Sequence, residues 1–571
     1  MYLSPRTDPT DRTMKRRGRI AAAILIVCAA VIVGRLFQLQ VAQHASWTAA
    51  AAAIQERTVE LPPRRGSIVD RDGELLAFDV RAMAIAVDGI NANEPDTLAR
   101  ILAEELRLAL DEVSNLVQRA SYFTWVDRRV DLETAQRIER RAREAGAYGL
   151  VLVDTWKRCY PQGCLASNVL GFVGTDGGGL EGIELAFDEH LRGEPRTLHV
   201  LEGADGRTYE IEVVEEGRPG DDLALTLDAE LQFLCEEEIA AGVGRYRADG
   251  GMIVVLDPTT GDVLSMAQDT TYDLNRFWTS TADERRNLAV THLFEPGSSF
   301  KVFTGLAALD AGVVAVGDTF DGNDGIEVSG HVMHNADRIS YGSVTFGQII
   351  EDSINTGMIR VAQRLGEGPL HDMLAELGFG QVTGIELPGE VAGILRDVKD
   401  WSGLALASTS IGQSVAVTGI QLARAMAAVA NGGILVAPRI VRSAGARDTN
   451  VETAIVASGG ACATMRDLMV RVVETGTGIL AAIDGFPIAG KTGTAQKAVP
   501  GRGYVDGKYT SLFAGILTAE NPEYVVLVVL DEVKATSVGG GSTAGPIFRA
   551  TASRLIHHEQ LVPAASYGSS P

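Results

Sequence analysis

Lysine, cysteine and histidine are all scarce in this sequence. Its 571 residues include eight lysines, five cysteines and nine histidines. So few cysteines exclude a disulfide-rich scaffold, and because no Cys/His cluster has the spacing of zinc ligands, we expect no metal site. We expect no cofactor either. The net charge of −23 would repel phosphate backbones, which argues against a nucleic-acid partner.

Internal repeats and low-complexity tracts are absent as well. Hydrophobic residues make up 46% and charged residues 22% of the chain, which excludes a largely disordered or fibrous protein. At about 150 residues per domain, this length predicts two to four folded domains, each large enough to bury a core.

A long apolar segment follows a basic N-terminus. Residues 1–19 carry six basic and two acidic side chains, a net charge of +4. The 15 residues Ile20–Gly34 have no charge, and apolar residues continue past Arg35 as far as Val41. Such a stretch is long enough to cross a bilayer, and Arg35 can reach the interface. We therefore expect a transmembrane anchor at 20–41, with the N-terminus in the cytoplasm and the rest of the chain outside.

A cleaved secretory signal is the competing interpretation. The unbroken apolar core has only 15 residues, and Ala42–Ala53 is rich in small residues. The uncleaved anchor is favoured because apolar residues continue past Arg35, where a cleavage region would be polar and small. Both interpretations place most of the chain outside the cytoplasm.

The cysteines fit an exported protein without requiring disulfides. Cys28 lies in the apolar segment, and Cys235 and Cys462 are isolated, as expected of buried thiols. Cys159 and Cys164 bracket a turn-like Tyr-Pro-Gln-Gly segment. In an oxidising compartment these two thiols could form a disulfide, and the sequence leaves this open.

The spacing of apolar residues predicts a mixed α+β chain. In the first half we expect an Ala-rich helix at His44–Gln55, strands at Val80–Val87 and Tyr122–Val130, and helices at Asp96–Leu110, Asp111–Ala120, Asp131–Ala145 and Asp228–Ala240. The second half has two early strands, a helical middle and three late strands, which predicts an antiparallel sheet packed on helices. These five strands are expected at Met252–Leu256, Val263–Ala267, Pro487–Gln496, Thr510–Leu517 and Tyr524–Leu530.

Ser298 and Lys301 lie at the start of a predicted helix. Pro296 and Gly297 precede that helix, so the serine is expected in its first turn with the lysine on the same face. A serine becomes a good nucleophile when a neighbouring base takes its proton, and a desolvated lysine can be that base. The helix N-terminus also offers N–H groups to a developing oxyanion. Alone, the pattern is more typical of a helix cap followed by a surface lysine.

Two further motifs favour the chemical interpretation. Of the eight lysines only Lys301 has a serine three positions before it, and Lys491 begins the sequence Lys-Thr-Gly-Thr. Ser353-Ile354-Asn355 lies between them. The order Ser-x-x-Lys, Ser-x-Asn, Lys-Thr-Gly within one exported domain resembles the motif set of penicillin-binding proteins and class A β-lactamases.

The resemblance extends from about Arg35 to Phe548 and is to the class B penicillin-binding proteins. Residues that look like the family's other motifs are Arg65–Gly73, Tyr160-Pro161, Gly182-Ile183-Glu184, Thr383-Gly384, Leu387–Glu390, Ile411–Gln413 and Gly540–Phe548. The resemblance implies a serine β-lactamase-like catalytic fold. It also implies peptidoglycan DD-transpeptidase activity, in which stem peptides are cross-linked through a serine acyl-enzyme.

Roles for individual residues follow from the same resemblance. Ser298 would attack the D-Ala-D-Ala carbonyl, and Lys301 would take its proton. Ser353 would relay a proton to the leaving amine, with the positive charge of Lys491 nearby. Asn355 would bind the substrate peptide. The side chains of Thr492 and Thr494 would bind the terminal carboxylate, and the N–H groups of Ser298 and Thr494 would form the oxyanion hole.

A glycine at position 493 has a physical explanation that does not depend on the resemblance. Without a side chain it would let the substrate backbone lie alongside the strand as an added strand. Because side chains alternate along a strand, Lys491 and Thr494 would face opposite sides. We therefore expect a local twist or a bulge at Gly493.

Water is not the expected acceptor. Glu386 and Glu390 are interpreted as structural loop residues, since neither is followed by the x-x-Leu-Asn of a hydrolytic class A β-lactamase. An amine acceptor is therefore preferred. The histidines form no evident dyad with Ser298, so a Ser/His/Asp hydrolase is not indicated.

The resemblance also implies the organisation of the chain, a membrane-anchored, elongated pedestal domain followed by a transpeptidase domain. We expect a cytoplasmic tail at 1–19, an anchor at 20–41, a pedestal of the dimerisation type at 42–240, a transpeptidase domain at 241–558 and a C-terminal tail at 559–571. The protein would be single-pass in the inner (plasma) membrane, with its catalytic domain outside the cytoplasm. β-Lactams would be covalent inhibitors. Expected partners are a polytopic membrane glycosyltransferase of the shape, elongation, division and sporulation group and other division proteins.

Several functional alternatives stay open. The compact pedestal favours a cell-division (septal) enzyme over an elongation enzyme. A membrane-anchored β-lactam sensor would be acylated at the same serine, but the single N-terminal span and the pedestal motifs argue against it. A scaffold without cross-linking activity is disfavoured because all three motifs are intact.

Overall fold

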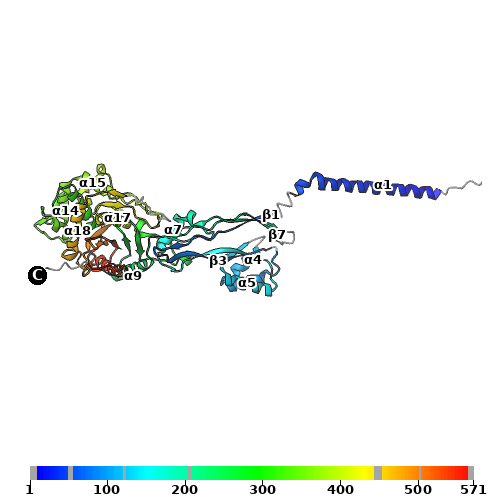
Figure 1. The fold of residues 1–571 in the computed structure, drawn as a ribbon, viewed down its shortest axis with the longest axis horizontal. Helices are drawn as coiled ribbons and strands as arrows, with labels where there is room; N and C mark the ends of the chain where they lie inside the picture. The colour runs from blue at the N-terminus through cyan, green and yellow to red at the C-terminus, as the bar shows by residue number, and fades with distance from the viewer. Residues whose placement is uncertain are drawn as a thin grey trace, which may run out of the picture. The chain divides into compact units, whose positions relative to one another are not determined.

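The computed structural model describes residues 9–48, 56–89, 91–119, 124–202, 208–442, 453–499 and 503–563. The chain forms two compact units (Figure 1). One comprises residues 1–63 and 194–218, and the other comprises residues 64–193 and 219–571.

The first unit contains the N-terminal helix. Helix α1 (Pro9–Phe37) continues into a π-helical turn, η1 (Gln38–Ala42). Within Thr13–Ala42 an 18-residue window has a mean hydropathy of 2.6 and none of that window is buried, so the helix is long and apolar enough to cross a membrane. Residues 44–48 are helical, and the rest of the helix expected at His44–Gln55 lies outside the described residues.

A three-stranded antiparallel sheet completes this unit. Two of its strands are neighbours along the chain, and the third comes from just after the anchor. The strand order is β1 (Glu56–Leu61), β6 (Arg196–Glu202) and β7 (Thr208–Glu215).

The second unit begins with an α+β region built around a long central strand. Strand β3 (Leu75–Val87) pairs with both β4 (Thr124–Asp131) and β5 (Leu150–Cys159). Three helices bury apolar faces against this sheet, which confirms the predicted elements apart from a few residues at their ends. They are α3 (Pro95–Leu106), α4 (Leu110–Arg119) and α5 (Leu132–Glu144). The other elements of this region are β2 (Ile68–Val69), α6 (Ser167–Leu170), α7 (Gly182–Ala186), α8 (Asp188–Arg192) and β8 (Leu223–Ala224).

A buried ionic cluster joins three of the sequence motifs in this region. Glu184 is fully buried and accepts hydrogen bonds from Arg65 Nε at 2.7 Å and Arg158 Nε at 2.6 Å. The Tyr160 hydroxyl donates to the same carboxylate at 3.2 Å. Removing one partner of a buried pair leaves an uncompensated charge and costs about 3–5 kcal/mol. These motif residues therefore hold the fold of this region together.

A five-stranded antiparallel sheet forms the centre of the C-terminal half. Its two early and three late strands match the prediction, and strands from both ends of the region lie side by side. The strand order is β10 (Val263–Gln268), β9 (Gly250–Leu256), β19 (Tyr524–Asp531), β18 (Gly503–Leu517) and β17 (Ala489–Val499).

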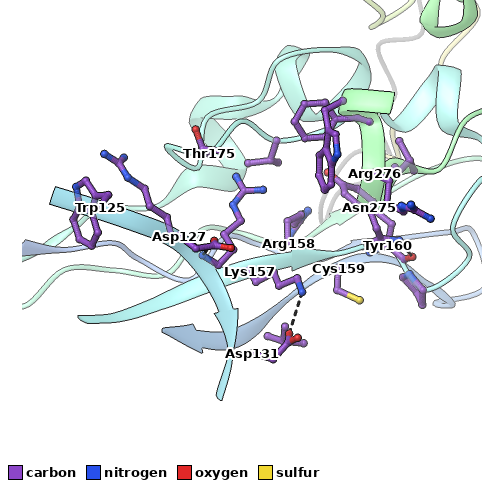
Figure 2. A pocket seen from close by; sticks show the side chains of 18 of the residues that line it. Trp125, Asp127, Asp131, Lys157, Arg158, Cys159, Tyr160, Thr175, Asn275 and Arg276 are labelled. Atoms are coloured by element: carbon purple, nitrogen blue, oxygen red, sulfur yellow. Dashed lines mark hydrogen bonds and ion pairs between the residues drawn. The ribbon is translucent and has the colours of Figure 1, made fainter. Parts of the chain in front are cut away.

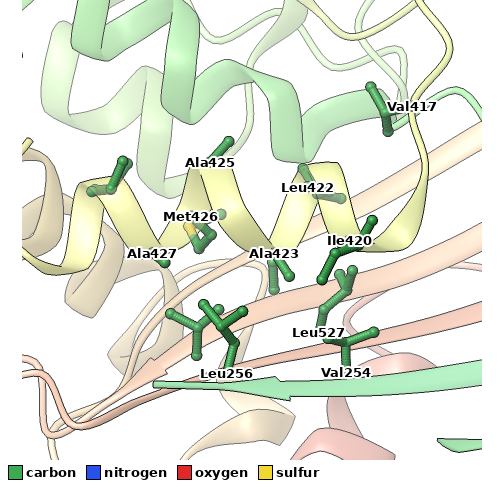
Figure 3. Close-up of a cluster of buried hydrophobic side chains, with 14 of the residues drawn as sticks. Val254, Leu256, Val417, Ile420, Leu422, Ala423, Ala425, Met426, Ala427 and Leu527 are labelled. Atoms are coloured by element: carbon green, nitrogen blue, oxygen red, sulfur yellow. The ribbon is translucent and has the colours of Figure 1, made fainter. Parts of the chain in front are cut away.

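Helices cover both faces of this sheet, so its strands are apolar on both sides. Val254, Leu256 and Leu527 point toward helix α17 (Gly419–Ala430), as Figure 3 shows. The alternate residues Ile253 and Val255 belong to a second cluster with α9 (Ala229–Tyr246) and α19 (Ala544–His558). Each fully buried aliphatic side chain contributes about 1.5–3 kcal/mol relative to exposure, so the sheet is a rigid support for whatever its edge strand β17 carries.

The helical middle lies between the early and late strands. Its main helices are α12 (Lys301–Asp310), α13 (Phe346–Glu351), α14 (Asn355–Leu365), α15 (Glu367–Glu376), α16 (Ala405–Ser410) and α18 (Gly459–Glu474). The short helices and turns are η2 (Leu274–Thr279), α10 (Ala282–Arg285), α11 (Leu288–Thr291), η3 (Gly297–Phe300), η4 (Val398–Asp400) and η5 (Ile479–Ala481). Three two-stranded ribbons pair β11 (Thr319–Asp321) with β14 (Ser343–Thr345), β12 (Ile326–Val328) with β13 (His331–Met333) and β15 (Ile434–Val436) with β16 (Thr453–Ile455).

All five cysteines are free thiols in this structure. Cys159 and Cys164, whose pairing the sequence leaves open, are therefore reduced here. Cys235 is buried, as expected, and burial raises the pKa of its thiol to about 12. Cys462 is buried too.

Candidate active site

Ser298 lies in the tight turn η3, directly before α12 begins at Lys301. The expected first helical turn is thus a 3₁₀ turn. The serine is half-buried, and within the described part of the chain its hydroxyl makes no hydrogen bond. Lys301, three residues on, is fully buried.

Close backbone contacts fix this turn against the edge strand β17. Gly297 has φ +55°, and a Cβ there would lie 2.7 Å from the Thr494 carbonyl oxygen. Its N–H donates to the Gly412 carbonyl at 3.0 Å. Gly412 itself has φ +76°, and a Cβ there would lie 2.1 Å from the Gly297 carbonyl oxygen. Only glycine fits both positions, so the motif around Gly412 supports the turn that carries Ser298.

The Lys301 amine contacts the second motif. Nζ lies 2.7 Å from Asn355 Oδ1 and 3.2 Å from Ser353 Oγ, and it donates a short hydrogen bond to the Ser353 carbonyl. The helical spacing predicts an amine beside the Ser298 hydroxyl. The amine instead bonds to the Ser-x-Asn segment, because that segment supplies three oxygens that a buried amine needs.

The Ser-x-Asn segment is a strained connection between two helices. Ser353 lies between α13 and α14 with φ +60°, a left-handed conformation that costs a residue with a side chain about 1 kcal/mol. Ile354 is buried in the core, and the Asn355 amide donates to the His334 carbonyl at 2.8 Å. These contacts hold Ser353 in place and present its hydroxyl and its carbonyl to the same amine.

A second buried lysine approaches Ser353 from the sheet. Lys491 on β17 is fully buried, and its Nζ donates to Ser353 Oγ at 3.0 Å and to its neighbour's carbonyl, Thr492 O, at 3.3 Å. The hydroxyl of Ser353 therefore lies between two amines. Lys301, Ser353, Asn355 and Lys491 form one hydrogen-bonded group, which we call the lysine cluster.

Burial sets the charge of the lysine cluster. It lowers the pKa of Lys301 well below its ordinary value, and the positive charge of Lys491 lowers that pKa further, while Asp337 opposes the shift. Burial alone lowers the pKa of Lys491 to about 7. Both amines thus lose their protons more readily than an ordinary lysine, and Lys491 is partly charged near pH 7. A neutral amine beside a charged one can accept a proton at neutral pH.

The strand carrying Lys491 runs through Gly493 without a bulge. Lys491, Gly493 and Thr494 pair in regular register with β18, and the register shifts only after Gln496. Of the local twist or bulge expected at Gly493, the bulge is therefore wrong. A Cβ on Gly493 would lie 2.7 Å from the Pro296 carbonyl oxygen and 2.7 Å from Leu512 Cγ, so the glycine lets β17 pack directly against the Ser298 turn.

The two threonines of the Lys-Thr-Gly-Thr motif have separate partners. Thr492 Oγ1 lies 2.9 Å from Thr477 Oγ1, and Thr494 Oγ1 accepts a hydrogen bond from Gly540 N at 3.0 Å. Gly540 belongs to a motif that the sequence already suggests. Thr477 was missed, and the Thr-Gly-Thr-Gly run at 475–478 is its only signal in the sequence.

The two glutamates interpreted as structural have structural contacts. Glu390 Oε1 accepts hydrogen bonds from Thr383 N at 2.7 Å and Thr383 Oγ1 at 2.6 Å. Glu386 Oε2 accepts from Ile440 N at 2.9 Å. Both carboxylates therefore hold loops.

One group of potential metal ligands exists within the described residues. Asp228, His558 and Glu559 place ligand atoms within 4.8 Å of one another. Asp228 already caps α9 by accepting from Leu231 N at 2.9 Å, and its other oxygen lies 2.8 Å from His558 Nε2. The hydrogen bonds of the Asp228 carboxylate explain why these side chains lie close together.

Comparison with known proteins identifies two families in the chain. Residues 251–553 match the penicillin binding protein transpeptidase domain, and residues 60–225 match the penicillin-binding protein dimerisation domain. A probable peptidoglycan D,D-transpeptidase PenA of Neisseria gonorrhoeae is 32% identical, over 96% of this chain and 94% of that protein. Penicillin-binding protein PbpB of Mycobacterium tuberculosis is 33% identical, over 95% of this chain and 85% of that protein.

A solved structure extends the likeness to three dimensions. Penicillin binding protein 3 of Mycobacterium tuberculosis, complexed with aztreonam, superposes with a TM-score of 0.69 at 29% identity, covering 89% of this chain and 98% of that one. The family matches include the lysine cluster and Ser298 in the first domain and the Arg65–Glu184 pair in the second. The chain belongs to the class B penicillin-binding proteins.

Proposed function

We propose that this protein is a serine-type D-Ala-D-Ala transpeptidase that cross-links peptidoglycan stem peptides through an acyl-enzyme on Ser298. The convergence of two buried lysines on the Ser353 hydroxyl carries this proposal, together with the Ser298 hydroxyl, which makes no hydrogen bond among the described residues. Relatives named peptidoglycan D,D-transpeptidases support it.

The contacts of Lys301 suggest how protons are held before reaction. A neutral amine has two N–H donors, which Asn355 Oδ1 and the Ser353 carbonyl accept. In the third contact of Lys301, the lone pair of Nζ then accepts a hydrogen bond from the Ser353 hydroxyl. The Ser353 oxygen in turn accepts from charged Lys491. A continuous line of hydrogen bonds thus joins the two amines through Ser353.

In the acylation step the Ser298 oxygen attacks the carbonyl carbon of the penultimate D-Ala. The Ser353 hydroxyl first turns from Lys301 toward the leaving amine, which frees the lone pair of Lys301. Lys301 then takes the Ser298 proton as the O–C bond forms, and the N–H groups of Ser298 and Thr494 stabilise the oxyanion. The C–N bond then breaks, and the leaving D-Ala amine receives a proton through Ser353. Charged Lys491 stabilises the transfer, and Lys301 returns to its neutral state once its proton has passed along the line.

The second step is the reverse with a different amine. The acceptor amine attacks the ester carbonyl, its proton passes to Lys301 or Ser353, and the Ser298 oxygen leaves and is protonated. Asn355 holds the peptide backbone in both steps, whereas the hydroxyls of Thr492 and Thr494 bind the terminal carboxylate in the first step, before D-Ala leaves with it. Glu386 and Glu390 are both occupied with loop contacts, so no carboxylate is assigned to activate water.

A thioester analogue of the stem peptide tests this preference for an amine. We expect the enzyme to consume the thioester slowly alone and several-fold faster when a D-amino acid acceptor is added, because an amine can give its proton to the cluster and water lacks a base of its own. The products are measured by liquid chromatography. Equal hydrolysis with and without acceptor, or rapid turnover of penicillin, would assign the protein to carboxypeptidases or β-lactamases instead.

β-Lactams are proposed as covalent inhibitors that acylate Ser298. The related structure from Mycobacterium tuberculosis is a complex with aztreonam. The acylated protein should be long-lived, for the same reason that hydrolysis of the thioester is slow.

We further propose a septal role for the enzyme. The dimerisation-domain match at residues 60–225 lies within the expected pedestal, and the compactness expected of that pedestal is the feature that favours division over elongation. The domains proposed are those expected from the sequence, with a pedestal at 42–240 and a transpeptidase domain at 241–558. The partner proposed is a polytopic glycosyltransferase, because the two family matches of the chain are a dimerisation domain and a transpeptidase domain, and glycan strands must be polymerised before they are cross-linked.

In the proposed topology the N-terminus lies in the cytoplasm, and Ser298 lies on the outer side of the plasma membrane. The apolar helix Thr13–Ala42 and the basic residues before it support this orientation. Protease added to spheroplasts is expected to degrade the chain beyond residue 42 and to leave a small, membrane-protected N-terminal fragment on immunoblots with an N-terminal tag. A mature N-terminus near residue 45, found by sequencing, would show a cleaved signal instead.

A further inference from the structure

A large open pocket lies in the second unit, and its lining includes no member of the lysine cluster. It has a volume of about 1150 Å³ and is lined by strands β4 and β5, the turn after β5 and the turn η2, which come from the two family regions of the chain. Figure 2 shows these side chains arranged around the space. We call it the pedestal pocket.

The pedestal pocket is basic in an acidic protein. Its lining has five basic and two acidic side chains, whereas the whole chain has a net charge of −23. The basic residues are Arg128, Arg129, Lys157, Arg158 and Arg276, and the acidic residues are Asp127 and Asp131. Such a reversal of sign in a hollow surface attracts an anionic ligand.

Several of these cations have donors to spare. In the part of the chain that the structure describes, no ion pair involves Arg128 or Arg276. Arg158 is 2% exposed in its side chain, and its Nη2 has no hydrogen-bond partner, although Nε and Nη1 are bonded. A buried guanidinium nitrogen without an acceptor is costly, and a carboxylate oxygen is the acceptor that suits it.

Aromatic rings lie among the cations. Trp278 is 67% exposed, and its ring packs edge-on against Phe277 at 5.4 Å between centroids. Phe277 is itself stacked on Phe172 at 4.0 Å, which fixes the base of this platform. Across the pocket the Arg128 guanidinium lies 5.0 Å from the centre of the Trp125 ring. Large rings held rigidly in the open are typical of binding surfaces.

We propose that the pedestal pocket binds an uncross-linked peptidoglycan strand, with stem-peptide carboxylates on Arg128 and Arg276 and a sugar ring against Trp278. The inference rests on the proposed function, since it names a second binding site for the same polymer. Sugar rings have apolar C–H faces that pack on aromatic rings, and planar guanidinium groups bind carboxylates through paired hydrogen bonds. A site of this kind raises the effective concentration of strands near Ser298.

An acidic protein segment is the other kind of occupant that a basic pocket attracts. The exposed Trp278 platform favours the glycan, because an acidic peptide needs cations but no flat apolar ring.

Binding of fluorescent, soluble, uncross-linked strands to the full-length protein in detergent tests the proposal. The protein is first acylated with benzylpenicillin so that Ser298 is blocked, and binding is followed by anisotropy. We expect the double variant Arg128→Gln/Arg276→Gln to weaken binding about tenfold or more, and Trp278→Ala about fivefold. Arg549→Gln, an exposed arginine on α19, is the matched control and should bind like the wild type. Added salt should weaken binding to the wild type more than to the double variant.

Two results would overturn the proposal. If the wild type and the pocket variants bind the strands with equal affinity and have the same melting temperature, the pedestal pocket does not bind the strand. Tighter binding of polyglutamate than of the strand would show a site for an acidic protein segment. Penicillin labelling tests the proposed function separately. A wild type that penicillin does not label would contradict the transpeptidase assignment, whereas the strand-binding measurement decides only whether the pedestal pocket binds the polymer.

Discussion

Replacing Lys301 with methionine is expected to slow acylation by penicillin about 10³-fold at pH 7.5. Lys301 is the buried amine whose pKa is lowered well below its ordinary value, so it is the group able to take the Ser298 proton. Methionine keeps the length and the apolar stem of lysine but offers no lone pair of useful basicity. Stopped-flow labelling with a fluorescent penicillin gives the second-order rate constant.

The control for this experiment is Lys399→Met. Lys399 has a side chain that is 73% exposed and pairs with Asp397 on the surface, so its loss should leave acylation unchanged. Thermal unfolding of both variants checks that they fold. A Lys301→Met protein that is folded and acylated within about threefold of the wild-type rate would exclude Lys301 as the base.

Replacing Lys491 with methionine is expected to raise stability while it damages acylation. The pKa of Lys491 is about 7 in the folded protein, below its ordinary value of 10.5, so between these pH values the unfolded chain binds more protons than the folded one. Stability of the wild type therefore rises with pH across this interval, and at or below pH 7 the buried charge costs several kcal/mol. Methionine removes that cost, and after the loss of the Ser353 hydrogen bond we expect a net gain of about 2 kcal/mol.

Two measurements check this prediction. Thermal unfolding between pH 6.5 and 9.5 should show a higher melting temperature for the variant at low pH and a shallower rise with pH. The acylation rate of the wild type should fall above about pH 7 as Lys491 loses its charge, and this upper limb should be missing in the variant. A variant that is less stable at pH 6.5, with an unchanged pH slope, would show that Lys491 is not buried as a titrating amine.

The sheet and the helices around it follow from apolar patterns alone. Val254 and Val255 alternate between two buried clusters, and a short, β-branched apolar run bounded by turn residues is typical of a strand buried on both faces. The N-terminal apolar helix is predicted from the length of its uncharged run. Element ends differ by a few residues because caps decide them, as at Arg107, which ends α3 in a left-handed conformation.

Sequence motifs predict which residues form the candidate site, but they do not predict the contacts among those residues. The helical spacing of Ser298 and Lys301 places both on one face and says nothing about the oxygens of Ser353 that compete for the amine. The left-handed backbone of Ser353 depends on tertiary contacts around Ile354. The sequence predicts a local twist or a bulge at Gly493. The structure instead requires a glycine there because the Ser298 turn packs against the strand, and this contact joins segments about 200 residues apart in the chain.

Intact-mass spectrometry of the full-length protein with benzylpenicillin tests the central claim most directly. The account predicts a mass increase of one whole penicillin molecule per chain, located by peptide mapping to the peptide that contains Ser298 and absent from Ser298→Ala. The same adduct on Ser298→Ala, or an adduct mapped to another serine of the wild type, would contradict it.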